Sequence, residues 1–166
     1  MLICLILVTS QGRMELANVL NFSAASLTKN SYGFSKFLYL RTVSNGVIFD
    51  ECIDVENLIF TGYVSDEECK ALYQNAKAFL HPSKFEGFGT PPLEALSLGT
   101  KVAVANATCL PEVYEDSVLY FDPDNYCVEI DEFMKDEVSS PEKILEKCNY
   151  DNCAKEIFEY LKNLNY

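Results

Sequence analysis

The amino-acid sequence predicts an α/β fold in which helices flank a parallel sheet. Short apolar runs alternate with helix-forming segments along the chain, as expected where helices join parallel strands. The length of 166 residues suits one domain with a substantial core. Apolar residues make up 49% of the chain, which excludes a disordered polypeptide.

The N-terminal part of the chain contains one clear element. Leu2–Val8 is a continuous apolar run, which indicates a buried parallel strand. The run is too short to cross a bilayer, and it lacks the preceding basic residue of a signal peptide. Met14–Leu27 has only a weak helical period. Ser31–Ser44 is rich in aromatic residues and ambiguous in structure, and we interpret its rings as core packing rather than as a sugar platform.

The patterns are clearer in the rest of the chain. Leu58–Phe60 predicts a short strand. Ser65 and Glu68 have the spacing of a capping box, and the helix that they predict has apolar residues at intervals of three and four. Further strands are predicted at Ala78–His81, Val102–Ala105 and Val118–Phe121, and further helices from Ser140 to Lys147 and over Ala154–Leu161.

The most informative segment is a glycine-containing loop that leads into a helix, Glu86-Gly87-Phe88-Gly89-Thr90-Pro91-Pro92-Leu93-Glu94. Glycine lets the backbone pass close to a ligand. Thr90 is predicted to be the N-cap and Pro91 the first helical residue, and the N–H groups of a helix start attract an anion. The helix is predicted to end at Gly99.

The position of this loop and its two carboxylates predict a ligand. The loop follows the Ala78–His81 strand, and open parallel sheets bind ligands at the carboxyl ends of their strands. Glu86 precedes the helix and Glu94 lies in its predicted first turn, so both can face one pocket. A phosphate cradle between two hydroxyl-binding carboxylates suits a nucleotide sugar. Taken singly, Glu86 could be an ordinary solvated loop residue. Glu94 could be an acidic side chain that interacts favourably with the helix dipole.

This segment and its flanks resemble the donor-binding half of family 4 glycosyltransferases, also called glycosyl transferases group 1. The matching segments are Phe60–Glu68, Ala78–Ser83, Glu86–Glu94, Gly99–Asn106, Leu110–Val113 and Tyr120–Pro123. The resemblance implies a single Rossmann-like nucleotide-sugar-binding domain over residues 1–166, similar to the C-terminal half of the GT-B fold and truncated at its N-terminus. Residues 1–46 match the family poorly, 47–124 carry the motifs, and 125–166 form the C-terminal helices.

The resemblance also implies roles for individual residues. Glu86 would be the catalytic residue that contacts the donor sugar, and Glu94 would hold the ribose. The sugar and diphosphate would be contacted by Gly87, Phe88, Gly89, Thr90 and Leu93, and the nucleobase by the turn Gly62, Tyr63 and Val64. His81 and Lys84 are further candidates; their alternatives are a histidine held by a backbone carbonyl and a solvated lysine. The donor is a nucleotide diphosphate sugar, and no metal or other cofactor is expected.

The function implied is transfer of a hexose, mannose or glucose, to a glycan or lipid-linked acceptor with retention at the anomeric carbon. A GT-B enzyme needs two Rossmann-like domains, and this chain has room for one. The family's Gly-Arg…Lys-Gly segment neutralises the leaving diphosphate, but no Lys-Gly follows Gly12-Arg13 here. We therefore expect a fragment or subunit that needs an N-terminal acceptor domain or a partner chain. The alternative is a non-catalytic nucleotide-sugar-binding or partner-interaction module.

Charge and cysteine content exclude other classes of protein. A net charge of −12 argues against nucleic acid as a partner, because a phosphate backbone needs a basic face. The seven cysteines are odd in number and form no CxxC pair, so we expect reduced thiols. A single histidine excludes a histidine-rich metal site. These features favour a cytoplasmic location, with membrane association only through a partner.

Overall fold

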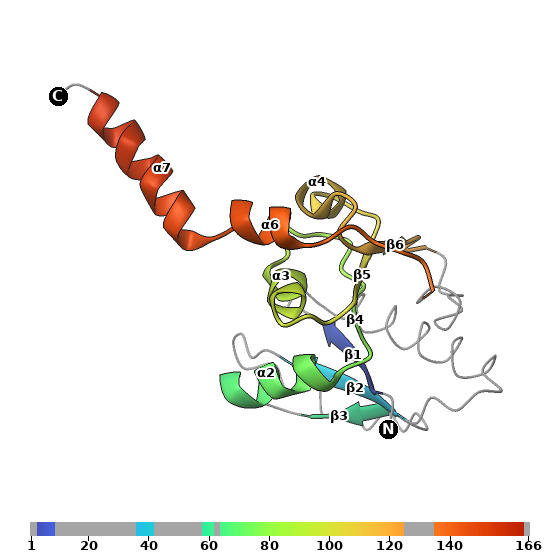
Figure 1. The fold of residues 1–166 in the computed structure, drawn as a ribbon. Coiled ribbons are helices and arrows are strands. Elements are labelled where there is room, and N and C mark those ends of the chain that lie inside the picture. The colour runs from blue at the N-terminus through green and yellow to red at the C-terminus, as the bar shows by residue number, and fades with distance from the viewer. Residues whose placement is uncertain (1–2, 9–35, 42–57, 62–63, 125–134, 165–166) are drawn as a thin grey trace.

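The structure is a computed structural model, and it describes residues 3–8, 36–41, 58–61, 64–124 and 135–164 (Figure 1). The described strands form one six-stranded sheet of order β3-β2-β1-β4-β5-β6. Every neighbouring pair in it is parallel. The strands are β1 (Ile3–Val8), β2 (Lys36–Arg41), β3 (Leu58–Phe60), β4 (Ala78–His81), β5 (Val102–Ala105) and β6 (Leu119–Phe121). The predicted α/β class with a parallel sheet is thus confirmed.

From β3 onward, helices alternate with strands and then follow the last strand. The described helices are α2 (Asp66–Asn75), α3 (Thr90–Ser97), α4 (Leu110–Tyr114), α6 (Glu142–Lys147) and α7 (Tyr150–Asn163). Because the strands are parallel, the carboxyl ends of β3, β4 and β5 meet at one edge. Each of these three strands is followed by a helix, so the starts of α2, α3 and α4 gather along that edge. This is the edge where such sheets bind ligands.

Local sequence signals explain the ends of two helices. The side chain of Ser65 caps α2 by accepting a hydrogen bond from the N–H of Glu68. The carboxylate of Glu68 in turn accepts a hydrogen bond from the N–H of Ser65 at 2.8 Å. The predicted capping box is therefore confirmed. Gly99 ends α3 with φ of +80°, a left-handed conformation that glycine adopts at little cost. The N–H groups of Gly99 and Thr100 donate to Leu96 and Ala95, which satisfies the last carbonyls of the helix.

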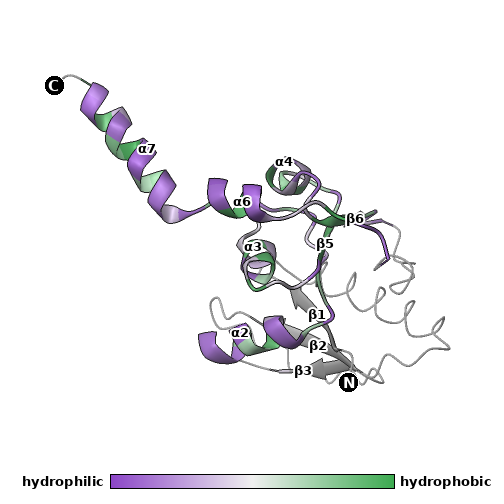
Figure 2. Ribbon diagram, in the orientation of Figure 1, coloured by the Kyte–Doolittle hydropathy of each residue, from purple (hydrophilic) through white to green (hydrophobic). Residues whose placement is uncertain are grey.

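The hydrophobic core lies between the central strands and the helices that cover them. Helix α3 packs on β4 and β5, and α6 packs against α3. Fully buried side chains come from strands and helices alike, among them Phe79, Val104, Ala95, Leu110 and Ile144. Hydrophobic residues accordingly concentrate on β5 and β6, and on parts of α3 (Figure 2).

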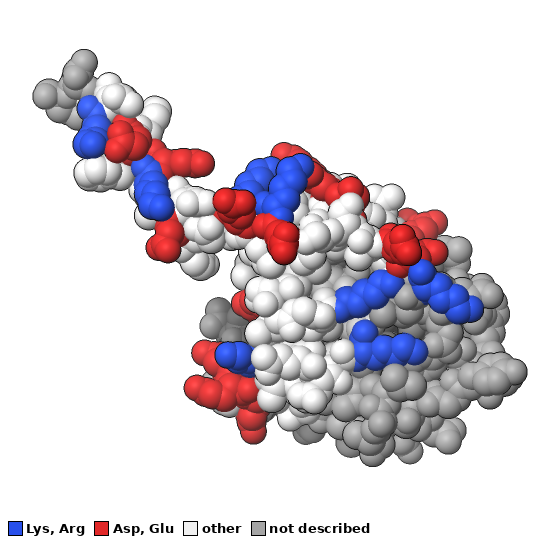
Figure 3. All heavy atoms as spheres, in the orientation of Figure 1, with Lys and Arg blue, Asp and Glu red and all other residues white. Residues whose placement is uncertain are grey.

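The last helix differs from the others. Helix α7 has no buried residue, and it projects away from the sheet (Figure 1). Hydrophobic and hydrophilic residues alternate along α7 (Figure 2). On the face shown in Figure 3, acidic and basic side chains are interleaved over α6 and α7. Its large apolar side chains Ile157, Phe158 and Leu161 are each more than half exposed. Within the described part of the chain, no helix has the length and hydrophobicity needed to span a membrane.

Two uncertain segments of the sequence and one unpredicted helix need comment. The ambiguous Ser31–Ser44 segment contains strand β2, which is paired on both sides. Helix α4 was not predicted, because five residues are too few to show a helical period. The Met14–Leu27 prediction lies outside the described residues.

Candidate functional site

The glycine loop lies between β4 and α3, at the carboxyl edge of the sheet. Gly89 is the N-cap of α3, with φ of +83°, and Thr90 is the first helical residue. The prediction that Thr90 is the N-cap and Pro91 the first helical residue is therefore wrong by one position. The physical reason is that Gly89 has no Cβ and can adopt the left-handed conformation that turns the chain into the helix. Glu94 becomes the fifth helical residue, and the first turn contains no acidic residue.

Gly89 is also required by packing. A Cβ atom added to Gly89 would lie 2.7 Å from Cδ2 of Leu110 on α4, closer than two carbon atoms can approach. Gly87 has nothing within 4 Å of the same added atom. The two glycines therefore differ: Gly89 permits the close contact of the loop with α4, whereas Gly87 is exposed.

Tyr114 holds the start of α3, a role that no sequence pattern predicted. Its buried hydroxyl donates a hydrogen bond to the carbonyl oxygen of Gly89. Burial raises the pKa of Tyr114, while a hydrogen bond from the backbone of Leu93 acts in the opposite direction. Because Pro91 and Pro92 have no N–H, the amides that this turn can offer to an anion are those of Gly89, Thr90 and Leu93, and Leu93 already contacts Tyr114.

Glu86 contacts His81 at the end of β4 and two residues that follow β5, Thr108 and Cys109. Its Oε1 lies 2.9 Å from Nε2 of His81, the last residue of β4. Its backbone N–H donates to Oγ1 of Thr108 at 3.3 Å, and its carbonyl oxygen accepts from Sγ of Cys109 at 3.2 Å. His81 is therefore held by a carboxylate rather than by the backbone carbonyl that the sequence suggested. The side chain of Glu86 is 15% exposed, so this carboxylate is largely withdrawn from solvent.

Glu94 lies in a different environment. It lines a cavity of about 390 Å³ between α2 and α3. The other lining residues are Asp66, Cys69, Lys70, Tyr73, Ser97 and Leu98. Burial raises the pKa of the Glu94 carboxyl, and the nearby charge of Asp66 raises it further. Glu86 is not among the residues that line this cavity, so the two carboxylates do not share it.

The remaining candidates lie at the loop, in the turn before α2 and at Lys84. Phe88 is 38% exposed and Thr90 is exposed, so both are accessible at the loop. Val64 packs against the core, whereas Gly62 and Tyr63 lie outside the described residues. Lys84 is not simply solvated, since its Nζ lies 2.5 Å from Oδ1 of Asp124.

No group of three or more histidine, cysteine, aspartate and glutamate side chains suited to a metal ion occurs in the described part of the chain. The described residues at this edge include carboxylates, backbone amides and one imidazole. The carboxylates can accept hydrogen bonds from hydroxyl groups, and the amides can donate to an anion.

Comparisons with known proteins agree with this geometry. The family model described as glycosyl transferases group 1 matches residues 50–151, more than half of the chain. O-antigen chain mannosyltransferase B of Escherichia coli is 48% identical over 66 residues, which are 40% of this chain and 17% of that protein. O-antigen chain mannosyltransferase RfbU of Salmonella typhimurium is 40% identical over 70 residues, 42% of this chain and 20% of that protein. The chain thus spans a fifth or less of either relative.

A solved structure has a similar fold. Sucrose-phosphate synthase from Thermosynechococcus elongatus superposes with a TM-score of 0.71 and 16% sequence identity, over 97% of this chain and 45% of that one. Structural neighbours of this kind have the GT-B architecture, and the present sheet and helices correspond to one of its halves.

Proposed function

Since the chain belongs to the glycosyl transferases group 1 family, we propose that it is the donor-binding domain of a family 4 enzyme that transfers a hexose from a nucleotide diphosphate sugar. The observation that carries the proposal is the glycine loop itself. It follows the central strand β4, begins α3 with a left-handed Gly89, and is flanked by Glu86 and Glu94. These features supply what a nucleotide sugar needs: amides for phosphate and carboxylates for hydroxyl groups.

The two carboxylates are assigned different parts of the donor. Glu86, held by His81, is the catalytic residue that accepts hydrogen bonds from the sugar. Glu94 lines the cavity between α2 and α3, and we assign it to the ribose. Backbone groups of Gly87–Thr90 are assigned to the sugar and diphosphate. The nucleobase is assigned to the Gly62–Val64 turn, where Val64 adjoins the capped start of α2.

Mannose is the first candidate for the transferred sugar, because two relatives are named mannosyltransferases. A growing glycan is the corresponding acceptor. In the proposed reaction the bond from the anomeric carbon to the diphosphate oxygen breaks, and a bond to an acceptor hydroxyl oxygen forms on the same face. The hydroxyl proton leaves with the nucleoside diphosphate or passes to solvent. No metal or other cofactor takes part in this proposal.

Transfer is proposed to need a second domain that binds the acceptor, on this polypeptide or on another. This proposal is supported by the structural match, which covers only 45% of the sucrose-phosphate synthase chain. We propose residues 1–166 as one domain of such a pair. The described cysteines Cys69, Cys109, Cys148 and Cys153 are free thiols, which fits a reducing compartment such as the cytoplasm.

Calorimetry on the chain tests donor binding. GDP and UDP should bind more tightly than GMP and UMP, because the start of α3 favours a dianionic group. Glu94→Gln should weaken binding of the nucleoside diphosphate itself, whereas Glu86→Gln should leave it unchanged. Equal affinity for the diphosphates and monophosphates, or no binding, would contradict the proposal.

A second experiment separates an enzyme from a non-catalytic module. The chain is combined with an acceptor-binding domain, and transfer from GDP-mannose is followed by product analysis. Transfer that Glu86→Gln abolishes supports the enzyme. Nucleotide-sugar binding without transfer in the assembled complex would favour the non-catalytic alternative.

A further inference from the structure

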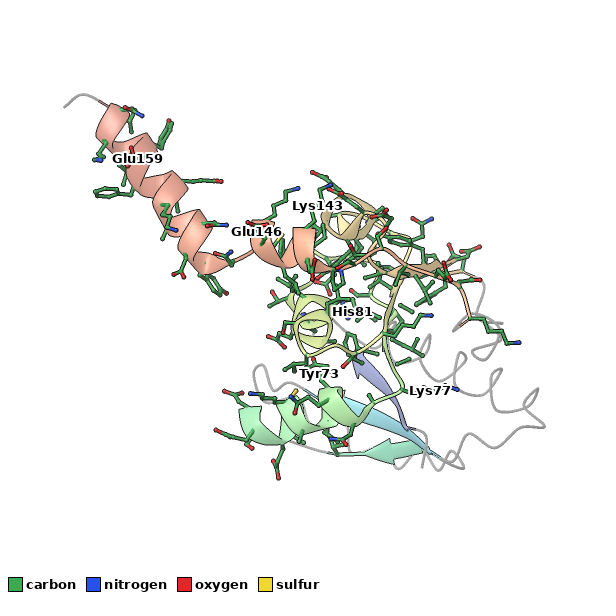
Figure 4. The ribbon with its side chains drawn as sticks, viewed as in Figure 1. Tyr73, Lys77, His81, Lys143, Glu146 and Glu159 are labelled. Atoms are coloured by element: carbon green, nitrogen blue, oxygen red, sulfur yellow. The ribbon has the colours of Figure 1, made fainter. Side chains whose placement is uncertain are left out.

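His81 is the single histidine of the chain, and it is completely buried at the carboxyl end of β4 (Figure 4). The ring of Phe79 stacks on the imidazole, with centroids 6.1 Å apart and planes inclined by 25°. Nε2 is 2.9 Å from Oε1 of Glu86. The imidazole is thus held by an aromatic ring and by a carboxylate. In the described part of the chain, the side chain that hydrogen-bonds to it is that of Glu86, the residue assigned to the sugar.

The other ring nitrogen is unusual. Among the described residues, Nδ1 of His81 is a buried side-chain atom without a hydrogen-bond partner. A neutral imidazole that donates from Nε2 to a carboxylate has an unprotonated Nδ1, which is an acceptor. Buried polar atoms are nearly always paired, so a residue that leaves one unpaired is a poor choice for filling the core. Leucine would occupy this strand position without that cost, which argues for a role of the imidazole at Nε2.

The contacts of Glu86 indicate what the imidazole of His81 does. Thr108 and Cys109, which follow β5, hold its backbone N–H and carbonyl oxygen. Neither of these contacts fixes the torsions of the side chain. The contact with His81 does, and it joins the carboxylate to a rigid central strand. Groups that bind a reacting molecule need this kind of support, because a loosely held side chain loses entropy on binding.

We propose that His81 is a positioning residue of the donor site, whose Nε2–H donates to Oε1 of Glu86 and orients that carboxylate for the donor sugar. The inference rests on the proposed function, because it takes Glu86 as the residue that contacts the sugar. His81 itself need not touch the donor. Its effect is specific to ligands that carry the sugar, and the nucleotide part of the site does not depend on it.

Two substitutions of similar size test the role of Nε2. The amide nitrogen of glutamine can donate from about the position of Nε2, whereas leucine fills the same space without a donor. His81→Leu should weaken binding of GDP-mannose about tenfold, the effect of losing one charge-assisted hydrogen bond, and should leave GDP affinity unchanged. His81→Gln should restore most of the affinity for GDP-mannose. Calorimetry gives both affinities, and urea unfolding shows that each variant is folded.

A second measurement needs no variant. Because the chain contains one histidine, ¹⁵N labelling of histidine gives the signals of a single imidazole. We expect a proton on Nε2 and none on Nδ1 in the free protein. GDP-mannose should shift the Nε2 signal, since the sugar competes for the same carboxylate, and GDP should not. A protonated Nδ1 with a bare Nε2, or equal shifts with both ligands, overturns the proposal even if His81→Leu does not fold.

The outcomes separate this inference from the proposed function. If the wild-type chain binds neither GDP nor GDP-mannose, nor UDP and UDP-glucose, the proposed function fails and the positioning role fails with it. If it binds them and His81→Leu behaves as wild type, only the positioning role is wrong. Equal loss of nucleotide and nucleotide sugar in a folded His81→Leu, or no rescue by His81→Gln, shows a structural role instead.

Discussion

The hydroxyl of Tyr114 donates a hydrogen bond to the carbonyl oxygen of Gly89, a residue 25 positions earlier in the chain. This contact joins the end of α4 to the N-cap of α3. Leu110, one turn before Tyr114, occupies the space that a Cβ atom on the same glycine would need. The conformation of the glycine loop is therefore set by α4 as well as by its own sequence.

Tyr114→Phe tests this dependence. The substitution removes the hydroxyl and with it a buried hydrogen bond to the carbonyl oxygen of Gly89. We expect the free energy of unfolding to fall by about 1–2 kcal/mol, and nucleotide affinity to fall as well because the start of α3 loosens. Urea unfolding and calorimetry with GDP measure the two effects.

Tyr120→Phe is the matched control for that variant. The hydroxyl of Tyr120 also donates to a backbone carbonyl, that of Glu115, at 2.6 Å. Its loss should reduce stability by an amount similar to or smaller than Tyr114→Phe, with no change in nucleotide affinity. Equal effects of both variants on affinity would show that Tyr114 acts only through global stability.

Three glycine substitutions separate backbone strain from steric contact. Gly99 has φ of +80° and open space around its missing Cβ, so Gly99→Ala should cost about 1 kcal/mol from strain alone. Gly89 has both a positive φ and the 2.7 Å contact with Leu110, so Gly89→Ala should cost more, about 2–4 kcal/mol. Gly87→Ala, with open space, should stay within about 0.5 kcal/mol of wild type. The reverse order in urea unfolding would contradict this account.

The elements that the sequence predicted well are those with a local signal. Buried parallel strands are short apolar runs, so Leu58–Phe60, Ala78–His81 and Val102–Ala105 match the structure at both ends. The start of α2 is encoded by the capping pair Ser65 and Glu68, which are three residues apart and hydrogen-bond to each other. For these elements, local preference and tertiary structure agree.

The details of the candidate site depend on contacts that are distant in sequence, and the sequence did not predict them. Thr90 is a good N-cap by residue type, but packing against Leu110 favours Gly89. Tyr114 lies in a helix too short to show a period. The pairing of His81 with Glu86 requires the loop to return to the strand end, which no local pattern reports. The motif indicated where the candidate site lies, and contacts distant in sequence set the geometry of its residues.

A pair of isoleucines tests the description of the C-terminal helices. Ile144 on α6 is 1% exposed, whereas Ile157 on α7 is 54% exposed. Ile144→Ala should lower the free energy of unfolding by about 2–4 kcal/mol, because it leaves a cavity in the core. Ile157→Ala should change it by no more than about 0.5 kcal/mol. A large loss with Ile157→Ala would mean that α7 packs on the domain in solution.

Glu94 should stabilise the bound state and destabilise the free protein. Burial and the charge of Asp66 raise the pKa of its carboxyl above the ordinary value of 4.5. Well below that value Glu94 is protonated in both the folded and unfolded states and contributes nothing. As the pH rises through 4.5, the unfolded chain loses the proton first, so the folded state loses stability until the pH passes the raised pKa.

Glu94→Gln removes this pH-dependent cost. At pH 7 the variant should have a higher free energy of unfolding than wild type, and near the acid limit of the folded state the difference should disappear. The same substitution should weaken binding of GDP or UDP, because a neutral amide is a poorer acceptor for two ribose hydroxyls. Glu146→Gln on α6 is an exposed control with the same change of charge, and it should alter neither quantity. Urea unfolding at several pH values, with calorimetry at pH 7, measures both. A variant that is less stable than wild type at pH 7 would contradict the cost of burying the carboxylate. A variant that binds nucleotide equally well would remove Glu94 from the proposed ribose site.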